Sequence, residues 1–178
     1  MKMIVPFMLI LTALAGCAAI PDYELAKRSE FIAANYAAVD KMIAASALPI
    51  DKSQPLLIAS LVNIDSLDQS SRFGRLISEQ IATRLTELGY NVVEMKLRNN
   101  VYIREGTGEL LLSRDVRDLS KNYNAQAVVV GNYAVAAEFV YLTLKTVTVA
   151  DNRVTGAANY LLPLNANTRE LLNPKSSY

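Results

Sequence analysis

The chain has no histidine, no tryptophan and a single cysteine, Cys17. Histidine is the commonest metal ligand and the usual general base near neutral pH, so its absence removes the ordinary route to both kinds of site. One cysteine cannot form a disulfide within the chain, and a zinc site normally needs histidines or several thiolates. Carboxylates alone can bind calcium or magnesium, but no aspartate-rich loop of the required spacing is present. We therefore predict no metal and no cofactor.

The chain also lacks a strong charge of either sign. It has 18 basic and 17 acidic residues, a formal net charge of +1. Nucleic-acid binding needs a basic patch that neutralises phosphates, so a nucleic-acid partner is not expected. The same balance argues against a polybasic segment that would hold the protein to an acidic membrane surface.

The amino terminus resembles the signal peptide of a bacterial lipoprotein. A positive start, Met1-Lys2, precedes an apolar run over residues 4–11 that is too short to span a bilayer. The segment Leu14-Ala15-Gly16-Cys17 then places small residues before a thiol, as in a lipobox. We predict a signal peptide over residues 1–16, peptidase recognition through Leu14, Ala15 and Gly16, and lipidation of Cys17. The alternatives are an ordinary secretory signal cut near Ala18-Ala19 and an uncleaved anchor.

Residue 18 is Ala rather than Asp. In Gram-negative lipoproteins an Asp at this position usually marks retention at the inner membrane, so the resemblance implies the outer membrane, with the domain facing the periplasm. Residues 17–52 are expected to form a lipidated tether and an N-terminal helix. The helix is predicted over Tyr23 to Ala47, because one apolar stripe has helical spacing. The stripe comprises Leu25, Ile32, Tyr36, Val39 and Ile43. It can pack on its own domain or on neighbouring subunits, and Pro49 is expected to end the helix.

A βαβ unit is predicted after the linker that runs to Pro55. Residues 56–62 form a continuous apolar run, which is typical of a strand buried on both faces. Ser70 or Ser71 can cap a helix whose apolar face repeats through Leu88, and Gly89 suits its C-terminal end. Residues 90–95 read as the next strand, and such a crossover is right-handed.

The rest of the chain predicts two further strands, a hairpin and a short helix. Residues 101–103 suit a brief strand, residues 106–108 a glycine turn, and Ser113 to Tyr123 a capped helix. Residues 127–133 form another buried strand, and residues 139–149 and 154–162 a hairpin around Asp151-Asn152. The tail from Asn165 is polar and expected to be loose. The predicted fold class is therefore α/β (α+β): a single domain over residues 53–178, with a mixed sheet, a βαβ unit and a C-terminal antiparallel hairpin. Helices pack on this sheet, and an N-terminal helix precedes it.

No set of residues makes a convincing catalytic site. Gly106-Thr107-Gly108-Glu109 lacks the lysine and hydroxyl of a phosphate loop. Ser113-Arg114-Asp115 lacks an adjacent base for a serine nucleophile, so Ser113 is interpreted as a helix cap. Glu105 and Glu109 form a carboxylate pair only if their loop brings them together, and no tryptophan accompanies them to bind a sugar. We therefore predict that the protein is not an enzyme.

Several segments together resemble the FlgO family of flagellar outer-membrane lipoproteins. These are residues 71–80, residues 89–94, the glycine turn at 106–108, residues 112–115 and residues 127–133. The similarity runs from about Leu56 to Pro163, and residues 18–52 lie outside it. The resemblance implies an outer-membrane lipoprotein that accompanies flagellar basal-body components, supports motility and is associated with an outer-membrane ring. It implies no catalytic residue.

Three functions are compatible with these features. The leading hypothesis is a structural or assembly role at the flagellar basal body, with other flagellar outer-membrane proteins as partners and a homo-oligomeric ring as a further expectation. The alternative is a periplasmic lipoprotein that binds and regulates an envelope enzyme or a secretion machine. A hydrolase of envelope polymers is the third. Candidate contact surfaces are the edge strand, the N-terminal helix, and the hairpin face with Tyr141, Thr143 and Lys145.

Overall fold

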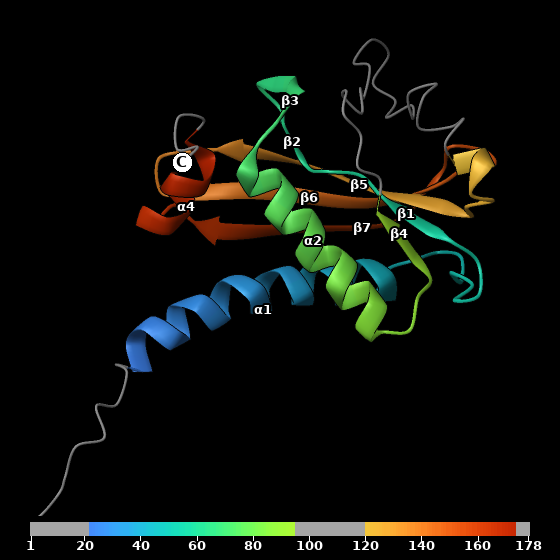
Figure 1. The fold of residues 1–178 in the computed structure, drawn as a ribbon, viewed down its shortest axis with the longest axis horizontal. Coiled ribbons are helices and arrows are strands. Elements are labelled where there is room, and N and C mark those ends of the chain that lie inside the picture. The colour runs from blue at the N-terminus through green and yellow to red at the C-terminus, as the bar shows by residue number, and fades with distance from the viewer. Residues whose placement is uncertain (1–21, 95–119, 174–178) are drawn as a thin grey trace, which may run out of the picture.

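A computed structural model describes residues 22–94 and 120–173 of the chain (Figure 1). The predicted strand at 101–103, the glycine turn at 106–108 and most of the helix from Ser113 lie outside these residues, and residues 120–122 are helical. The helices are α1 (Asp22–Ala44), α2 (Arg72–Glu87) and α4 (Ala166–Leu172). The strands are β1 (Leu56–Ile58), β2 (Val62–Asn63), β3 (Ser66–Ser70), β4 (Val92–Glu94), β5 (Ala127–Val135), β6 (Phe139–Thr148) and β7 (Val154–Pro163).

The seven strands form one mixed sheet with β5 at its centre. On one side of β5 lie β1 and β2, both parallel to it, and β4 lies parallel to the outer side of β1. On the other side, β6 and β7 continue the sheet in antiparallel order. The order β1, α2, β4 confirms the predicted βαβ unit, and β6 with β7 confirms the hairpin. The predicted class, an α+β domain with a mixed sheet and a preceding helix, is confirmed.

The strand predicted over residues 56–62 is interrupted. Residues 56–58 form β1, and the chain resumes pairing with β5 at Val62 as β2. Helix α2 supplies a hydrogen-bond partner for the backbone between β1 and β2, because the buried Ser78 hydroxyl accepts from the Leu61 N–H at 3.0 Å. A Cβ on Gly74, one turn earlier, would overlap the Leu61 carbonyl oxygen. Strand β2 then pairs with β3, an antiparallel connection that the sequence did not predict.

Helix α2 begins and ends where its sequence predicts. The Ser71 hydroxyl is the N-cap and accepts a hydrogen bond from the Gly74 N–H at 2.8 Å, which satisfies one of the free amides of the first turn. Gly89 follows the last turn with φ +84°, a conformation that glycine adopts without strain. Phe73, at the start of the helix, packs edge-on against Tyr133 of β5 and Phe31 of α1. These contacts join both long helices to the centre of the sheet.

Helix α1 packs on its own domain over the part whose side chains are described. Val39 and Met42 are fully buried, and Asn35 reaches Tyr160 of β7. Beyond the helix, the Ala47 N–H donates to the Thr155 carbonyl of β7 at 2.7 Å. The helix ends at Ala44, five residues before Pro49. Of the predicted stripe, Val39 is buried, Tyr36 and Ile43 are partly buried, and Ile32 is exposed.

The segment after β7 corrects the prediction of a loose tail. Residues 166–172 form α4, because the Asn165 side chain caps the helix by accepting from the Thr168 N–H at 3.0 Å. Thr168 is buried and donates from its hydroxyl to the Pro163 carbonyl at 2.9 Å. The Arg72 side chain of α2 forms an ion pair with Glu170 of α4. This helix therefore belongs to the folded domain.

Candidate interaction surface

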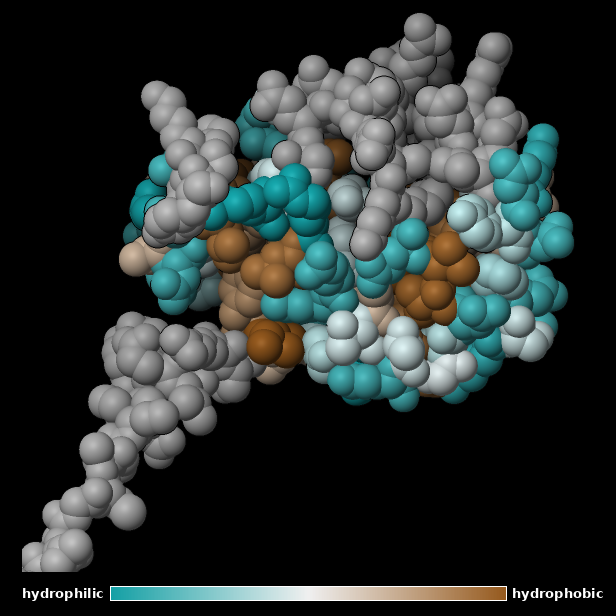
Figure 2. All heavy atoms as spheres, viewed as in Figure 1, coloured by the Kyte–Doolittle hydropathy of each residue, from teal (hydrophilic) through white to brown (hydrophobic). Residues whose placement is uncertain are grey.

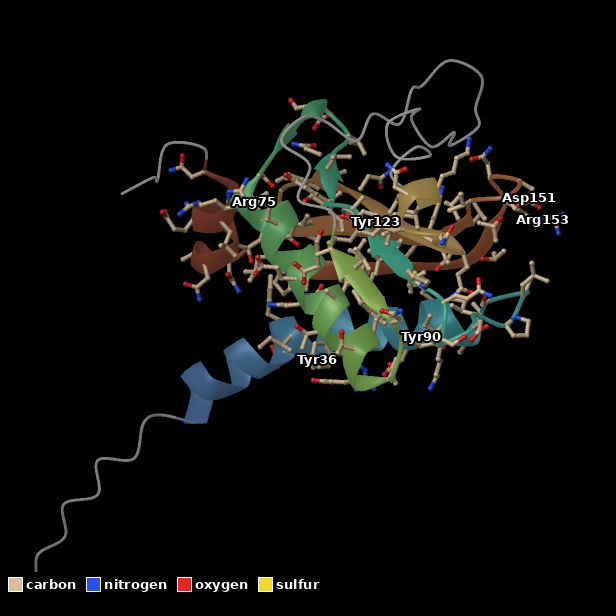
Figure 3. All side chains as sticks on the ribbon, turned by 45° about the vertical axis from the view of Figure 1, so that its right-hand side comes forward. Tyr36, Arg75, Tyr90, Tyr123, Asp151 and Arg153 are labelled. Atoms are coloured by element: carbon tan, nitrogen blue, oxygen red, sulfur yellow. The ribbon has the colours of Figure 1, made fainter. Side chains whose placement is uncertain are left out.

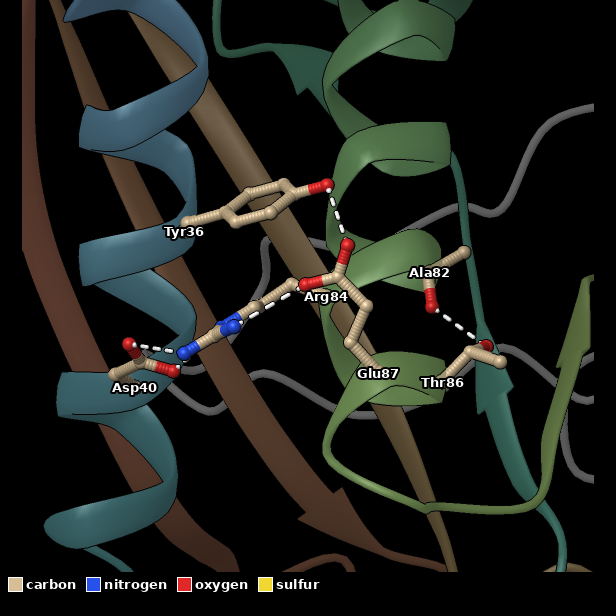
Figure 4. A network of polar contacts seen from close by, with 6 residues as sticks. All are labelled: Tyr36, Asp40, Ala82, Arg84, Thr86 and Glu87. Carbon is tan, nitrogen blue, oxygen red and sulfur yellow. Dashed lines mark hydrogen bonds and ion pairs between the residues drawn. The ribbon is translucent and has the colours of Figure 1, made fainter.

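An exposed network of polar side chains fastens α1 to α2 (Figure 4). The Arg84 guanidinium donates to both oxygens of Asp40 at 2.9 Å and to Glu87 at 3.1 Å. Tyr36 completes the network by donating from its hydroxyl to Glu87 at 3.2 Å. The hydrogen bonds to Asp40 raise the pKa of Arg84 above its ordinary value, and the hydrogen bond to Glu87 adds to this rise. Every charge in this network has a partner in the same network, so we interpret it as a structural clamp.

A second, buried set of polar groups links the two helices to β7. The Tyr160 hydroxyl donates to Asn35 Oδ1 at 2.6 Å, and Asn35 Nδ2 donates to Gln80 Oε1 at 2.6 Å. Asn35 is fully buried, and burial raises the pKa of Tyr160, so this phenol stays protonated at neutral pH. The chain of hydrogen bonds satisfies groups that would otherwise be costly to bury. It leaves none of these three side chains free to act as a base or nucleophile.

The described residues contain no cluster of three or more His, Cys, Asp or Glu side chains that could hold a metal ion. The sequence candidates Cys17, Leu14, Ala15 and Gly16 lie outside the described residues. So do Ser113, Arg114 and Asp115, and so do Glu105 and Glu109. Over residues 22–94 and 120–173, no helix combines the length and the apolar character that a membrane span needs.

The predicted hairpin face is present. Tyr141, Thr143 and Lys145 alternate along β6 with the buried residues Leu142 and Leu144, so their side chains share the face of the sheet away from the helices. Tyr141 is 52% exposed, and Leu161 directly opposite on β7 is 47% exposed. Thr143 and Lys145 are only partly exposed. The apolar part of this face is therefore its Tyr141 end.

The opposite end of the same hairpin is polar. Figure 3 shows Asp151 and Arg153 together at the β6–β7 turn, far from Arg75 on α2. Arg153 forms an ion pair with Asp151 at 3.1 Å. A hydrogen bond from the Thr148 hydroxyl lowers the pKa of Asp151, and the Arg153 N–H contributes in the same direction. The two ends of the hairpin thus differ in the type of side chain that they expose.

A shallow groove lies where α1, α2 and α4 meet. Its volume is about 250 Å³, and it is lined by Phe31, Ile32, Leu76, Gln80, Asn165, Asn167, Thr168 and Leu171. Figure 2 shows apolar residues gathered in the hollow between these helices. The groove was not predicted, because the segment after Asn165 reads as a polar tail in the sequence. The Asn165-x-x-Thr168 cap followed by Leu171 and Leu172 was the signal that could have revealed it.

Comparisons with known proteins agree with this architecture. The family described as FlgO protein matches residues 36–167, which include the last nine residues of α1 as well as the sheet. No curated protein matches the chain. Among solved structures, the LpoB C-terminal domain from Salmonella enterica superposes with a TM-score of 0.53 at 14% identity, covering 75% of this chain and 98% of that domain.

Two structures of Escherichia coli LpoB show the same similarity. Its C-terminal domain gives a TM-score of 0.52 at 14% identity, with 75% of this chain and 98% of that domain covered. The NMR structure gives 0.50 at 14% identity, with 90% and 84% covered. At such identity the likeness establishes the fold and nothing further. The match over residues 36–167 spans most of the chain, and the protein belongs to the FlgO family.

Proposed function

We propose that the protein is an outer-membrane lipoprotein with a structural or assembly role at the flagellar basal body, where it supports motility. The observation that carries this proposal is the FlgO family match over residues 36–167. The match covers the folded domain, including its βαβ unit and hairpin, and the flagellar role is what the FlgO resemblance implies. Its partners would be other flagellar outer-membrane proteins and further copies of itself.

The amino terminus supports a membrane attachment. The segment Leu14-Ala15-Gly16-Cys17 has the form of a lipobox, and a lipidated Cys17 would become the first residue of the mature chain. Each buried CH₂ group of an acyl chain contributes about 0.8 kcal/mol, so one chain holds a protein only weakly. A bacterial lipoprotein carries three acyl chains, which make the attachment stable. Attachment also concentrates many copies on one surface, which favours assembly through weak interfaces.

The described side chains support a role in binding rather than catalysis. The polar clusters around Arg84 and Asn35 are used within the fold. The surfaces left over are a groove and an apolar end of the hairpin, and both suit contact with another surface. The alternative, a lipoprotein that regulates an envelope enzyme or a secretion machine, fits the same surfaces, because the likeness to LpoB extends only to the fold.

The anchor can be tested with matched variants. Cells that express wild type, Cys17→Ser or Ala18→Asp are labelled with palmitate and fractionated. We expect the wild type to incorporate label and to reach the outer membrane. Cys17→Ser should incorporate none, and Ala18→Asp should be labelled but retained at the inner membrane. Palmitate label on Cys17→Ser would show that Cys17 is not the lipid site.

The flagellar role can be tested by swimming. A deletion strain should lose or reduce swimming while its growth rate stays normal, and wild type supplied in trans should restore swimming. Normal swimming together with altered sensitivity to cell-wall antibiotics would overturn the flagellar proposal and favour the regulatory alternative. Complementation by Cys17→Ser, at equal protein level, then shows whether the anchor contributes to the role.

A further inference from the structure

Exposed apolar side chains gather at one end of the sheet. Within the described residues they include Val135 at the end of β5, Phe139 and Tyr141 at the start of β6, and Leu161 near the end of β7. Cross-strand register places Tyr141 beside both Ala134 and Leu161. Val135, Phe139, Tyr141 and Leu161, called here the hairpin tip, are between 36% and 52% exposed. Phe139, Tyr141 and Leu161 lie on the face away from the helices, whereas Val135, which pairs with the buried Val140, lies on the other face. Single exposed apolar residues are ordinary, but a cluster of them marks a contact surface.

The hairpin tip lies at the same end of the molecule as the start of α1. The helix runs antiparallel to β7, since Asn35 contacts Tyr160 and Ala47 contacts Thr155. Asp22 precedes Asn35 by 13 residues, about 20 Å of helix at 1.5 Å per residue. Pro163 follows Tyr160 by three residues, about 10 Å of strand. Helix α1 therefore begins roughly 10 Å beyond the end of β7. Figure 1 shows the start of α1 and the end of β7 on the same side of the molecule.

The chain between the anchor and α1 is short. Only residues 18–21 separate Cys17 from Asp22. Even when fully extended, the five steps from Cys17 to Asp22 span at most about 17 Å. A lipid on Cys17 would therefore hold this end of the domain close to the membrane surface, and the opposite end, with Asp151 and Arg153, would point away from it.

The charges at the hairpin tip do not oppose a contact between this end of the domain and a membrane surface. Between β5 and β6 the tip carries the acidic Glu138, and Arg169 of α4 donates to the neighbouring Ala137 carbonyl at 3.4 Å. Nearby, Arg72 is paired with Glu170. Charges of both signs are present, so neither repulsion nor attraction of one sign dominates. The aromatic and aliphatic side chains of the tip can then contact the headgroup region of a membrane.

We propose that the hairpin tip rests in the headgroup region of the membrane that holds the anchor, and so fixes the orientation of the domain. This inference depends on the lipidation of Cys17 in the proposed function. Alone, four partly exposed side chains would bind lipid weakly. The anchor raises their effective concentration at the surface and converts a weak contact into a persistent one.

The absence of tryptophan allows a direct test, because a single introduced tryptophan is then the only source of tryptophan fluorescence in the chain. Leu161→Trp and Val154→Trp form a matched pair on β7. Their native side chains are 47% and 42% exposed, and they lie about 23 Å apart along the strand. Phe139→Trp, an aromatic replacement, provides a second reporter at the tip. The full-length lipidated variants are placed in vesicles of phosphatidylethanolamine and phosphatidylglycerol whose acyl chains carry bromine near the headgroup.

We expect tryptophan at position 161 or 139 to be quenched by the brominated lipid and shifted to shorter emission wavelength, while tryptophan at position 154 keeps the emission of a water-exposed residue. Equal, unquenched emission at all three positions in protein that floats with the vesicles would overturn the inference and leave the anchor intact. A blue shift at position 161 without lipid would also overturn it, because it would indicate contact with a second copy. Failure to float with the vesicles would contradict the anchor itself.

Discussion

Two phenylalanines illustrate how this domain divides its apolar residues. Phe73 is fully buried where α1, α2 and β5 meet, with its ring 5.0 Å from that of Tyr133. Phe139 begins β6 at the hairpin tip and is 36% exposed. The first side chain joins elements that are distant in sequence, whereas the second adds little to the core. The difference teaches that apolar character alone does not show whether a residue serves folding or contact, and that position in the sheet decides it.

The largest predicted effect comes from the buried member of this pair. Phe73→Ala should lower the free energy of unfolding by about 3–5 kcal/mol, because it removes a large side chain and leaves a cavity. Phe139→Ala should lower it by less than about 1 kcal/mol, as expected for a partly exposed position. Urea unfolding followed by circular dichroism measures both. Similar losses for the two variants would contradict the division between core and contact surface.

A smaller loss is expected where α2 closes the interrupted strand. Ser78→Ala removes the acceptor of the buried Leu61 N–H and should cost about 1–3 kcal/mol. Thr83→Ala is the control on the same helix, since its exposed hydroxyl donates to the Glu79 carbonyl of the preceding turn. Alanine favours helix slightly more than threonine, so this control should be neutral or stabilising. The same urea experiment compares the two variants. Equal losses of unfolding free energy would show that Ser78 does not stabilise the interruption between β1 and β2.

Stability should fall at alkaline pH because of buried phenols. Burial raises the pKa of Tyr160 and of Tyr133, although a hydrogen bond to Ser71 opposes the rise for Tyr133. Since the folded pKa lies above the unfolded value of about 10, this stability is complete below pH 10 and is lost as pH rises above it. Circular dichroism recorded against pH measures this loss of structure. Tyr160→Phe should flatten the decline, and an unchanged slope would exclude Tyr160 as its source.

The smallest effect is expected at the clamp between α1 and α2. Arg84→Ala should lower the melting temperature only slightly, and by less at high salt, because the Arg84 side chain is 27% exposed and the Asp40 side chain is 45% exposed. Arg153→Ala, which removes a more exposed pair at the polar end of the hairpin, should have no measurable effect. Thermal unfolding at two salt concentrations compares the variants. A loss for Arg84→Ala that salt does not change would point to the contact of its guanidinium with the Tyr36 ring, whose centroid is 5.4 Å away.

The sequence predicts the regular elements well and their connections less well. Residues 72–87, 127–135 and the two hairpin strands follow their hydrophobic periodicity, and the caps Ser71 and Gly89 fix the ends of α2. The break between β1 and β2 falls at residues 59–61, where Ser60 is the one polar residue of an otherwise apolar run. That run alone predicts a single strand, because the break depends on Ser78 and Gly74 from the following helix. Helix α4 escapes detection for a similar reason, since its short apolar segment is stabilised by contacts with α2 and with Pro163.

The candidate surfaces were only partly predictable. The alternation of Tyr141, Thr143 and Lys145 gives a shared face in any strand, and the structure has it. The sequence does not show that the apolar end of this face lies at the same end of the molecule as the start of α1, since that follows from the antiparallel packing of α1 on β7. The groove likewise needs three helices that are far apart along the chain.

The most direct test of the flagellar account is electron cryotomography of basal bodies in three strains: wild type, the deletion, and the deletion complemented with Cys17→Ser. We predict that the deletion lacks or distorts density at the outer-membrane ring, and that Cys17→Ser fails to restore it at normal protein level. Intact ring density in the deletion strain would contradict a structural role at the flagellar base. Full restoration by Cys17→Ser would keep that role but remove the anchor from it.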